Sequence, residues 1–254
     1  MTSVIANTFA LVRLTAPELT GRSATHVRAV EGSQCALHPL AQRACQLMAV
    51  AASRAGIELA AISCFRGFET QLAIWNGKFS GQRPLLSRQG EPLDALSLDE
   101  PARVDAILTW SALPGASRHH WGTDFDVIDR AALPAGERVQ LVPAEYAPGG
   151  WFAPLDQWLQ ENAADYGFFR PYDSDRGGVL PEPWHLSFAP LATLALQDLG
   201  VDVLAASLAD APLQGRDTVF SRLPELHRRY VMAVAEAPPA ALAAAALSDA
   251  ARPS

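Results

Sequence analysis

The spacing of apolar side chains along the chain predicts several helices. Between 38 and 56 the apolar residues recur at helical spacing, and Gly56 can end that helix. A second amphipathic helix is predicted over 155–166, where the apolar side chains gather on one face. Shorter helices are expected over 69–75 and 100–108. These segments predict helical layers that cover a core.

Strands are predicted where apolar and polar residues alternate, or where short apolar runs are bounded by turn residues. The segment 123–128 alternates in this way, and 57–65 and 167–169 are further strand candidates. Proline, serine and glycine are frequent in 80–101, which predicts a long loop over a cleft, and proline and glycine also punctuate 131–150. The fold class predicted is α+β: a small antiparallel sheet flanked by helices, with a helical C-terminal extension.

Length and composition exclude some classes of protein. The chain has 254 residues, of which 49% are hydrophobic, so it can bury a full core within one enlarged domain. Its net charge of −7 and the lack of a basic stripe argue against nucleic acid as a partner. No segment reaches the length of an apolar membrane span. The oligomeric state stays open.

The cysteines and the N-terminus bear on the compartment. Cys35, Cys45 and Cys64 are odd in number and lack C-x-x-C spacing, so we expect no disulfide, no cysteine–zinc site and a reducing environment. Residues 1–10 lack a basic region followed by an uninterrupted apolar run, so no signal peptide is expected. The protein is therefore predicted to be cytoplasmic, with periplasmic export by an unmarked route left open.

Two short segments carry the candidate chemistry. The first runs from Ser117 to Asp126 and contains His119, and the second is a Glu-Pro-Trp-His sequence that ends at His185. A catalytic zinc ion takes three protein ligands and leaves a fourth position for water. His119, Asp126 and His185 supply such a set, and Glu182 then remains as a general base.

The local sequence predicts how these side chains are presented. Gly122 permits a turn that carries His119, and Asp126 lies on the alternating strand that follows. Pro183 argues against a helix interior in the second segment. Its glutamate and histidine are therefore expected to project from a strand end or a loop.

Both segments resemble a known family. The patterns Ser-x-His-x-x-Gly-x-Ala-x-Asp and Glu-x-Trp-His are similar to those of the zinc D-Ala-D-Ala carboxypeptidases and dipeptidases (VanY-like and VanX-like), in the lysostaphin/D-Ala-D-Ala metallopeptidase superfamily. The resemblance implies that His119, Asp126 and His185 bind Zn²⁺ and that Glu182 is the base. Asp124 departs from the pattern, because the family usually has alanine there. This third carboxylate either tunes the metal or faces solvent.

A third segment strengthens the resemblance. Residues 63–71 resemble the family's Ser-Gly-Tyr-Arg-Ser-x-x-x-Gln block, which implies that Arg66 and Gln71 contact the substrate's terminal carboxylate at the active site. A guanidinium can pair with a planar carboxylate through two hydrogen bonds. The alternative for Arg66 is an ordinary salt bridge. Ser117 is either a substrate contact or the end of a turn.

Other polar and aromatic residues have less support. His120 adjoins His119 but fits the spacing of the pattern less well. Trp184 is expected to be a packing residue that orients His185 rather than a reactive group. Three further histidines have no supporting pattern and are expected to be surface or core residues: His26, His38 and His227.

The similarity covers about 35 to 190, and helices are predicted over 191–208 and 219–237. An alanine- and proline-rich sequence follows, which is expected to fray. The predicted parts are an N-terminal extension at 1–34, a zinc metallopeptidase core at 35–190, a helical C-terminal extension at 191–237 and a flexible tail at 238–254.

The activity that the resemblance implies is zinc-assisted removal of a terminal D-alanine from peptidoglycan stem peptides, as muropeptides. A cytoplasmic enzyme that cut D-Ala-D-Ala would destroy the cell's own wall precursors, so an LD-carboxypeptidase acting on recycled tetrapeptides is the first hypothesis. A DD-carboxypeptidase acting on pentapeptides is the alternative. The superfamily also includes endopeptidases, against which Arg66 and Gln71 argue, and a non-catalytic zinc-bearing binding module, against which Glu182 argues.

Overall fold

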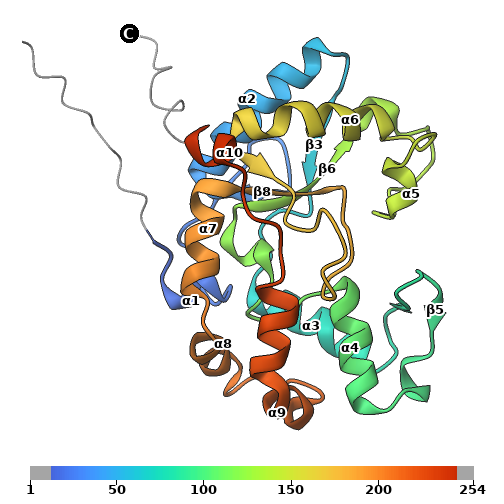
Figure 1. The fold of residues 1–254 in the computed structure, drawn as a ribbon, viewed down its shortest axis with the longest axis vertical. Coiled ribbons are helices and arrows are strands. Elements are labelled where there is room, and N and C mark those ends of the chain that lie inside the picture. Colours follow the sequence, from blue (N-terminus) through green and yellow to red (C-terminus); the bar gives the residue numbers. More distant parts are fainter. Residues whose placement is uncertain (1–12, 245–254) are drawn as a thin grey trace, which may run out of the picture.

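The computed structural model describes residues 13–244, and a four-stranded antiparallel sheet lies at its centre (Figure 1). The predicted fold class, a small antiparallel sheet flanked by helices, is confirmed. The sheet has the order β3-β6-β8-β7, so neighbours in the sheet come from distant parts of the sequence. Its strands are β3 (Leu59–Ile62), β6 (Asp124–Asp129), β7 (Phe168–Phe169) and β8 (His185–Phe188).

Two helices cover one face of the sheet, α2 (Pro39–Arg54) and α6 (Ala153–Asn162), and both lie along the top of Figure 1. The alternation along β6 explains this packing, because Phe125 and Val127 belong to the hydrophobic core shared with these helices. The intervening acidic side chains are directed to the opposite face. The sheet therefore has an apolar face and a face that carries the candidate site.

The helices at the C-terminal end share a second hydrophobic core with the middle of the chain. Trp75 is fully buried in this core, and its indole N–H donates to the carbonyl of Gln214. The C-terminal helical extension is thus part of the packed molecule. The helices of this core are α3 (Phe68–Phe79), α4 (Glu100–Trp110), α7 (Ala189–Asp198), α8 (Val201–Leu208) and α9 (Arg216–Leu226).

The helix expected over 191–208 is broken at Leu199 and Gly200. The ψ of 72° at Leu199 leaves the helical region, and α7 and α8 meet at an angle of 77°. Within residues 13–244 no single helix is long and apolar enough to cross a membrane, although this bent pair passes by length and composition. The helix expected over 219–237 ends early, in a π-helical turn at His227–Val231.

The tail expected to be flexible from 238 onward begins with a short helix, α10 (Pro239–Ala243), so that expectation was wrong for this part. Ala241 is fully buried, and α10 packs against α7 and against the 3₁₀ turn Ala163–Tyr166. Burial of small apolar side chains explains why this alanine-rich sequence is ordered. The rest of the tail, 245–254, lies outside the described residues.

The segments predicted as loops contain short elements. Residues 80–101 form a small hairpin followed by a 3₁₀ turn, and 131–150 include one helical turn. The N-terminal part packs on the molecule too, since the Trp121 indole donates to the carbonyl of Leu19 at 3.1 Å. These elements are α1 (Ala16–Leu19), β1 (Arg28–Ala29), β2 (Ala36–Leu37), β4 (Leu85–Leu86), β5 (Pro92–Leu93), α5 (Pro143–Tyr146), and the 3₁₀ turns Ala95–Ser97 and Arg130–Ala132.

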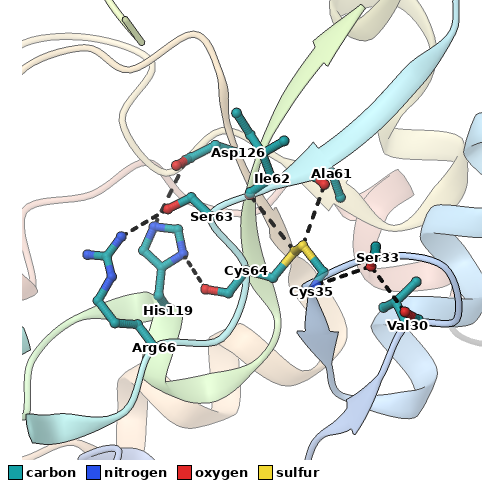
Figure 2. The surroundings of a disulfide bond; sticks show 10 residues. All are labelled: Val30, Ser33, Cys35, Ala61, Ile62, Ser63, Cys64, Arg66, His119 and Asp126. Carbon is teal, nitrogen blue, oxygen red and sulfur yellow. Dashed lines mark hydrogen bonds and ion pairs between the residues drawn. A yellow bond between two sulfur atoms is a disulfide. The ribbon is translucent and has the colours of Figure 1, made fainter. Parts of the chain in front are cut away.

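The expectation of three unpaired cysteines was wrong. Cys35 and Cys64 form a disulfide (Figure 2), and their Cα atoms are 5.2 Å apart. Cys45 is a buried free thiol. An odd number of cysteines shows only that one is left over. The pairing depends on the fold, because β2 places Cys35 beside the end of β3, where the amide of Phe65 donates to the carbonyl of Ala36.

Candidate metal site

The sheet brings two of the predicted ligands together. In the register of β6 and β8, Asp126 lies directly opposite His185. Side chains of directly opposed residues lie on the same face, with their Cβ atoms about 5 Å apart. The His185 Nδ1 atom accordingly lies 3.5 Å from Asp126 Oδ1. The antiparallel pairing of β6 with β8 therefore brings Asp126 of the first motif to His185 of the second.

The third predicted ligand, His119, lies in the 3₁₀ turn Arg118–Trp121 before β6. Gly122 ends this turn with φ +65°, and a Cβ there would lie 2.3 Å from Val27 Cγ1. The Nδ1 atom of His119 is 3.1 Å from the carbonyl of Cys64, as Figure 2 shows. This bond leaves Nε2 of His119 directed at the site, 3.9 Å from Asp126 Oδ1.

The Glu-Pro-Trp-His segment forms a β-turn. The amide of His185 donates to the carbonyl of Glu182 at 3.1 Å, and Pro183 occupies the second position, where its fixed φ favours a turn. The turn brings both end residues to one place, with Glu182 Oε2 3.4 Å from His185 Nδ1. The expectation that this pair projects from a strand end or loop is confirmed.

The three predicted ligands form a group that fits a metal ion. One donor atom from each of His119, Asp126 and His185 lies within 4.8 Å of the others, and all three side chains are buried. Asp126 Oδ1 and His185 Nδ1 have no hydrogen-bond partner among the described residues. Two imidazoles and one carboxylate are a ligand set that suits catalytic zinc. Buried polar atoms without partners are costly, and a bound cation would satisfy them.

The charges of the site also favour a cation. Burial lowers the pKa of His119 to about 3, so its imidazole is neutral and free to act as a ligand. Burial alone would also lower the pKa of His185, but the hydrogen bond to Asp124 and the nearby carboxylates of Asp126 and Glu182 raise it well above its ordinary value. Burial raises the pKa of Glu182, against the opposing effect of His185. This concentration of negative charge would equally stabilise a metal cation.

The group opens into a cavity of about 700 Å³. One wall is the β4–β5 hairpin, the opposite wall is the segment leading into α5, and both lie on the right of Figure 1. Trp110 and Tyr172 also line it. A cavity of this size can hold a short peptide.

Arg66 lines the cavity. Its Nη1 donates to Gln71 Oε1 at 2.9 Å and its Nη2 to Ser63 Oγ at 2.9 Å. Gln71 is fully buried, donates to the carbonyl of Ala112 and does not line the cavity. The structure therefore places the guanidinium where a ligand can reach it and Gln71 behind it.

Ser117 and His120 lie in or beside the turn that holds His119, but only Ser117 lines the cavity. Ser117 lines the cavity and also begins the turn, since its carbonyl accepts the amide of His120. The His120 side chain is fully buried, outside the cavity, with Nδ1 2.5 Å from the carbonyl of Arg66 and Nε2 accepting the amide of Gly115. His120 therefore braces the backbone of Arg66.

The remaining sequence candidates also have clear positions. Asp124 is fully buried, so it does not face solvent. Trp184 is buried against Tyr146, with ring centroids 5.8 Å apart, as expected of a packing residue. The three histidines without a pattern each bond to the backbone: His26 to the carbonyl of His120, His38 to the amide of Leu40 and His227 to the carbonyl of Leu199.

Sequence reasoning missed two cavity residues. Tyr172 packs edge-on against His185, with ring centroids 5.1 Å apart, and its carbonyl accepts the amide of Glu182. Arg88 extends from the hairpin and binds Asp175 and the carbonyl of Gly178. A lone tyrosine and a loop arginine have no spacing pattern that could have identified them.

Comparison with known proteins identifies a family for this chain. The sequence pattern of the VanY family, described as D-alanyl-D-alanine carboxypeptidase, matches residues 34–191. A Haemophilus influenzae protein of uncharacterized function is 36% identical over 126 residues, which are 49% of this chain and 96% of that protein. A D-alanyl-D-alanine carboxypeptidase of Enterococcus faecalis is 31% identical over 83 residues, covering 32% of this chain and 25% of that protein.

Solved structures with some similarity include the LdcB LD-carboxypeptidase. That structure has a TM-score of 0.48 and 22% sequence identity, and the match covers 83% of this chain and 80% of that one. A VanY D,D-pentapeptidase mutant in complex with Zn(II) has a TM-score of 0.46 and 20% identity, covering 77% of this chain and 90% of that one.

Proposed function

Since the chain belongs to the VanY family of D-alanyl-D-alanine carboxypeptidases, we propose that it is a zinc-dependent carboxypeptidase that removes the terminal D-alanine from peptidoglycan stem peptides. The observation that carries this proposal is the buried group of His119, Asp126 and His185 beside Glu182, at the floor of a cavity that also contains Arg66. Zinc bound there would polarise the scissile carbonyl and make a water nucleophilic near neutral pH.

Glu182 is the proposed proton carrier. Its Oε2 lies beside the ligand group, and burial raises its pKa toward the range in which a carboxylate both accepts and returns a proton. It would take a proton from the attacking water and deliver it to the leaving amine. No ligand role is needed from Glu182, because the other three residues already complete the set.

Arg66 is the proposed anchor for the free C-terminal carboxylate. The guanidinium is held by Ser63 and Gln71, which fixes its plane before a substrate arrives. A preorganised guanidinium recognises a carboxylate well. This supports removal of a terminal residue over cleavage inside a chain, and it assigns Gln71 the role of positioning Arg66.

The disulfide bears on both compartment and substrate. The hypothesis of tetrapeptide trimming depended on a reducing cytoplasm, for which unpaired cysteines were one ground, and the Cys35–Cys64 bond removes that ground. Disulfides persist mainly in oxidising compartments. We therefore propose that the enzyme works outside the cytoplasm, where both tetrapeptides and pentapeptides of the wall are accessible to it.

Incubation of the zinc-loaded protein with purified muropeptides, followed by mass spectrometry, tests the proposal. Loss of one alanine is expected, and parallel rates on tetrapeptide and pentapeptide stems assign LD or DD specificity. The Glu182→Gln protein is the matched control. An internal cut would replace the proposal with an endopeptidase, and unchanged muropeptides would favour a binding protein.

A further inference from the structure

Asp124 is the one position where the first motif departs from the family pattern, and it lies directly behind a proposed ligand. Its side chain is fully buried, and its Oδ1 atom is 3.0 Å from Nε2 of His185. Asp124 and Asp126 are two apart on β6, so both side chains lie on the face that carries the site. In the pairing with β8, Asp124 is the diagonal neighbour of His185.

Two further contacts hold the Asp124 carboxylate in place, and a third holds the arginine that makes one of them. Arg118 Nε donates to Oδ1 at 2.7 Å, and the Thr123 hydroxyl donates to Oδ2 at 2.6 Å. A second guanidinium nitrogen of Arg118 donates to the hydroxyl of Ser187, the residue opposite Asp124 on β8. Because Arg118 is also buried, the pair is a charge-neutral unit with little freedom to move.

These contacts determine which ring nitrogen of His185 faces the metal group. A carboxylate accepts hydrogen bonds and donates none, so Nε2 of His185 must carry a proton when it bonds to Asp124. In a neutral imidazole the other nitrogen then has a free lone pair. That nitrogen, Nδ1, is the atom that lies beside Asp126 and Glu182.

We propose that Asp124 is a positioning residue that fixes the tautomer and ring orientation of His185, so that Nδ1 is presented to zinc. A carboxylate bonded to the far nitrogen of a ligating histidine orients the ring and makes it a stronger ligand. The alanine usual in the family has no acceptor at this position. The inference depends on the zinc site of the proposed function and adds to it a role for Asp124.

The first measurement is zinc affinity, by competition with a chromophoric chelator. Asp124→Ala should weaken zinc binding by about 10- to 100-fold, the range typical for loss of such a partner. Asp124→Asn should bind zinc more tightly than Asp124→Ala does. The asparagine oxygen can still accept from His185 Nε2 and Arg118 Nε, and the asparagine NH₂ group can donate to the Thr123 hydroxyl. Equal losses in both variants would assign the effect to charge alone and overturn the positioning role.

Asp129→Asn is the matched control. Asp129 is a buried carboxylate at the end of the same strand, but among residues 13–244 it accepts only from the backbone amides of Glu58 and Ala131. Its substitution should leave zinc affinity unchanged. Asp124→Ala leaves the buried Arg118 without its ion-pair partner and can therefore fail to fold. In that case zinc affinity is measured on the double variant Asp124→Ala/Arg118→Met, which has no unpaired buried charge at this pair.

The second measurement is the N–H proton of His185 in NMR spectra of protein labelled with ¹⁵N-histidine. Zinc-loaded wild-type and Asp129→Asn proteins should show a protected Nε2–H signal that Asp124→Ala lacks. An unchanged signal, or zinc affinity of Asp124→Ala equal to that of wild type, would refute the inference. Wild-type protein that binds no zinc would instead refute the proposed function itself.

Discussion

Glu182 and His185 occupy the two ends of one β-turn, yet their substitution has different expected consequences. His185 presents a nitrogen to the ligand group, whereas Glu182 stands beside it, with the carboxylate oxygen 3.4 Å from that nitrogen. Removing a ligand weakens metal binding, while removing a base leaves the metal in place. The two roles can therefore be separated by measuring zinc content and turnover on the same variants.

Glu182→Gln should retain zinc and lose most of its turnover. The amide has the same shape as the carboxylate but cannot carry the proton, and general acid–base catalysis contributes about 10²- to 10⁴-fold. Turnover of a stem peptide by zinc-loaded protein measures this. The control is Glu58→Gln, since Glu58 is exposed and lies outside the cavity. Near wild-type turnover of Glu182→Gln would exclude it as the base.

His119→Ala and His185→Ala should each lose most of their zinc, because each removes one of the three proposed ligands. His120→Ala, next to His119, should keep its zinc, since within the described part of the chain the His120 side chain hydrogen-bonds only to the backbone of Arg66 and Gly115. Metal analysis after dialysis against a weak chelator distinguishes the three proteins. Full zinc retention in both ligand variants would defeat the assignment.

For individual residues, the sequence predicted the candidate metal ligands but not the side chains that hold the site residues in position. Metal ligands must be of particular types at particular spacings, so the candidate ligands His119, Asp126 and His185 could be predicted from the sequence, and the structure brings them together. The role of Gln71 depends on what lies between it and the cavity, which no spacing reports. The contacts of Asp124 required the pairing of β6 with β8.

Among the elements, the turn before β6 has the tightest steric requirement. Gly122 has φ +65°, and a Cβ there would lie 2.3 Å from Val27 Cγ1 and 3.0 Å from the amide nitrogen of His38. The turn must nevertheless end there, because it places His119 and Asp126 on the same side of the sheet. The backbone conformation of Gly122 therefore determines how His119 and Asp126 are placed relative to each other.

Gly122→Ala should lower the free energy of unfolding by more than the ~1–2 kcal/mol that a left-handed backbone costs an L-residue, because the clash adds to it. Gly32→Ala is the matched control, with φ +73° and nothing within 4 Å of the added methyl group. Urea denaturation of both variants measures the difference. Equal losses would mean that Val27 and His38 move aside without cost.

Helices and strands with a strong apolar periodicity were predicted well from the sequence, and those with a weak pattern were not. The helix expected over 38–56 is observed as α2 (Pro39–Arg54), which buries one face, and the alternating segment is β6, which is buried on both faces with Phe125 and Val127 in the hydrophobic core and Asp126 at the candidate site. The break between α7 and α8 was missed, since both halves are apolar and only packing distinguishes a bend from a continuous helix. Two-residue strands such as β4 are too short to leave a pattern.

Over the whole molecule, the Cys35–Cys64 bond connects the N-terminal hairpin to the metal group. Cys64 follows β3, and its carbonyl accepts the Nδ1–H of His119 (Figure 2). The same segment continues to Arg66, whose amide donates to the carbonyl of His119. One covalent link therefore holds the chain that supports both a ligand and the proposed carboxylate anchor. Its detection from sequence failed because the two cysteines meet only after the sheet has formed.

Reduction of this bond should lower the free energy of unfolding. In the native fold it should expose only the two thiols that it releases, those of Cys35 and Cys64. The bonded cysteines are 29 residues apart, and closing a loop of that length is worth roughly 3–4 kcal/mol in the chain-entropy account. Cys45 is buried, and burial raises the pKa of its thiol to about 12, so it should stay unreactive until the chain unfolds.

Urea denaturation with and without prior reduction measures the stability, and thiol titration in urea counts the free cysteines. The unreduced, unfolded chain should titrate as one thiol and the reduced chain as three. A Cys45→Ala protein is the control, because it should titrate as zero before reduction and two after. Three thiols in unreduced wild-type protein would show that the bond does not form, and would restore the reducing compartment expected from the cysteine count.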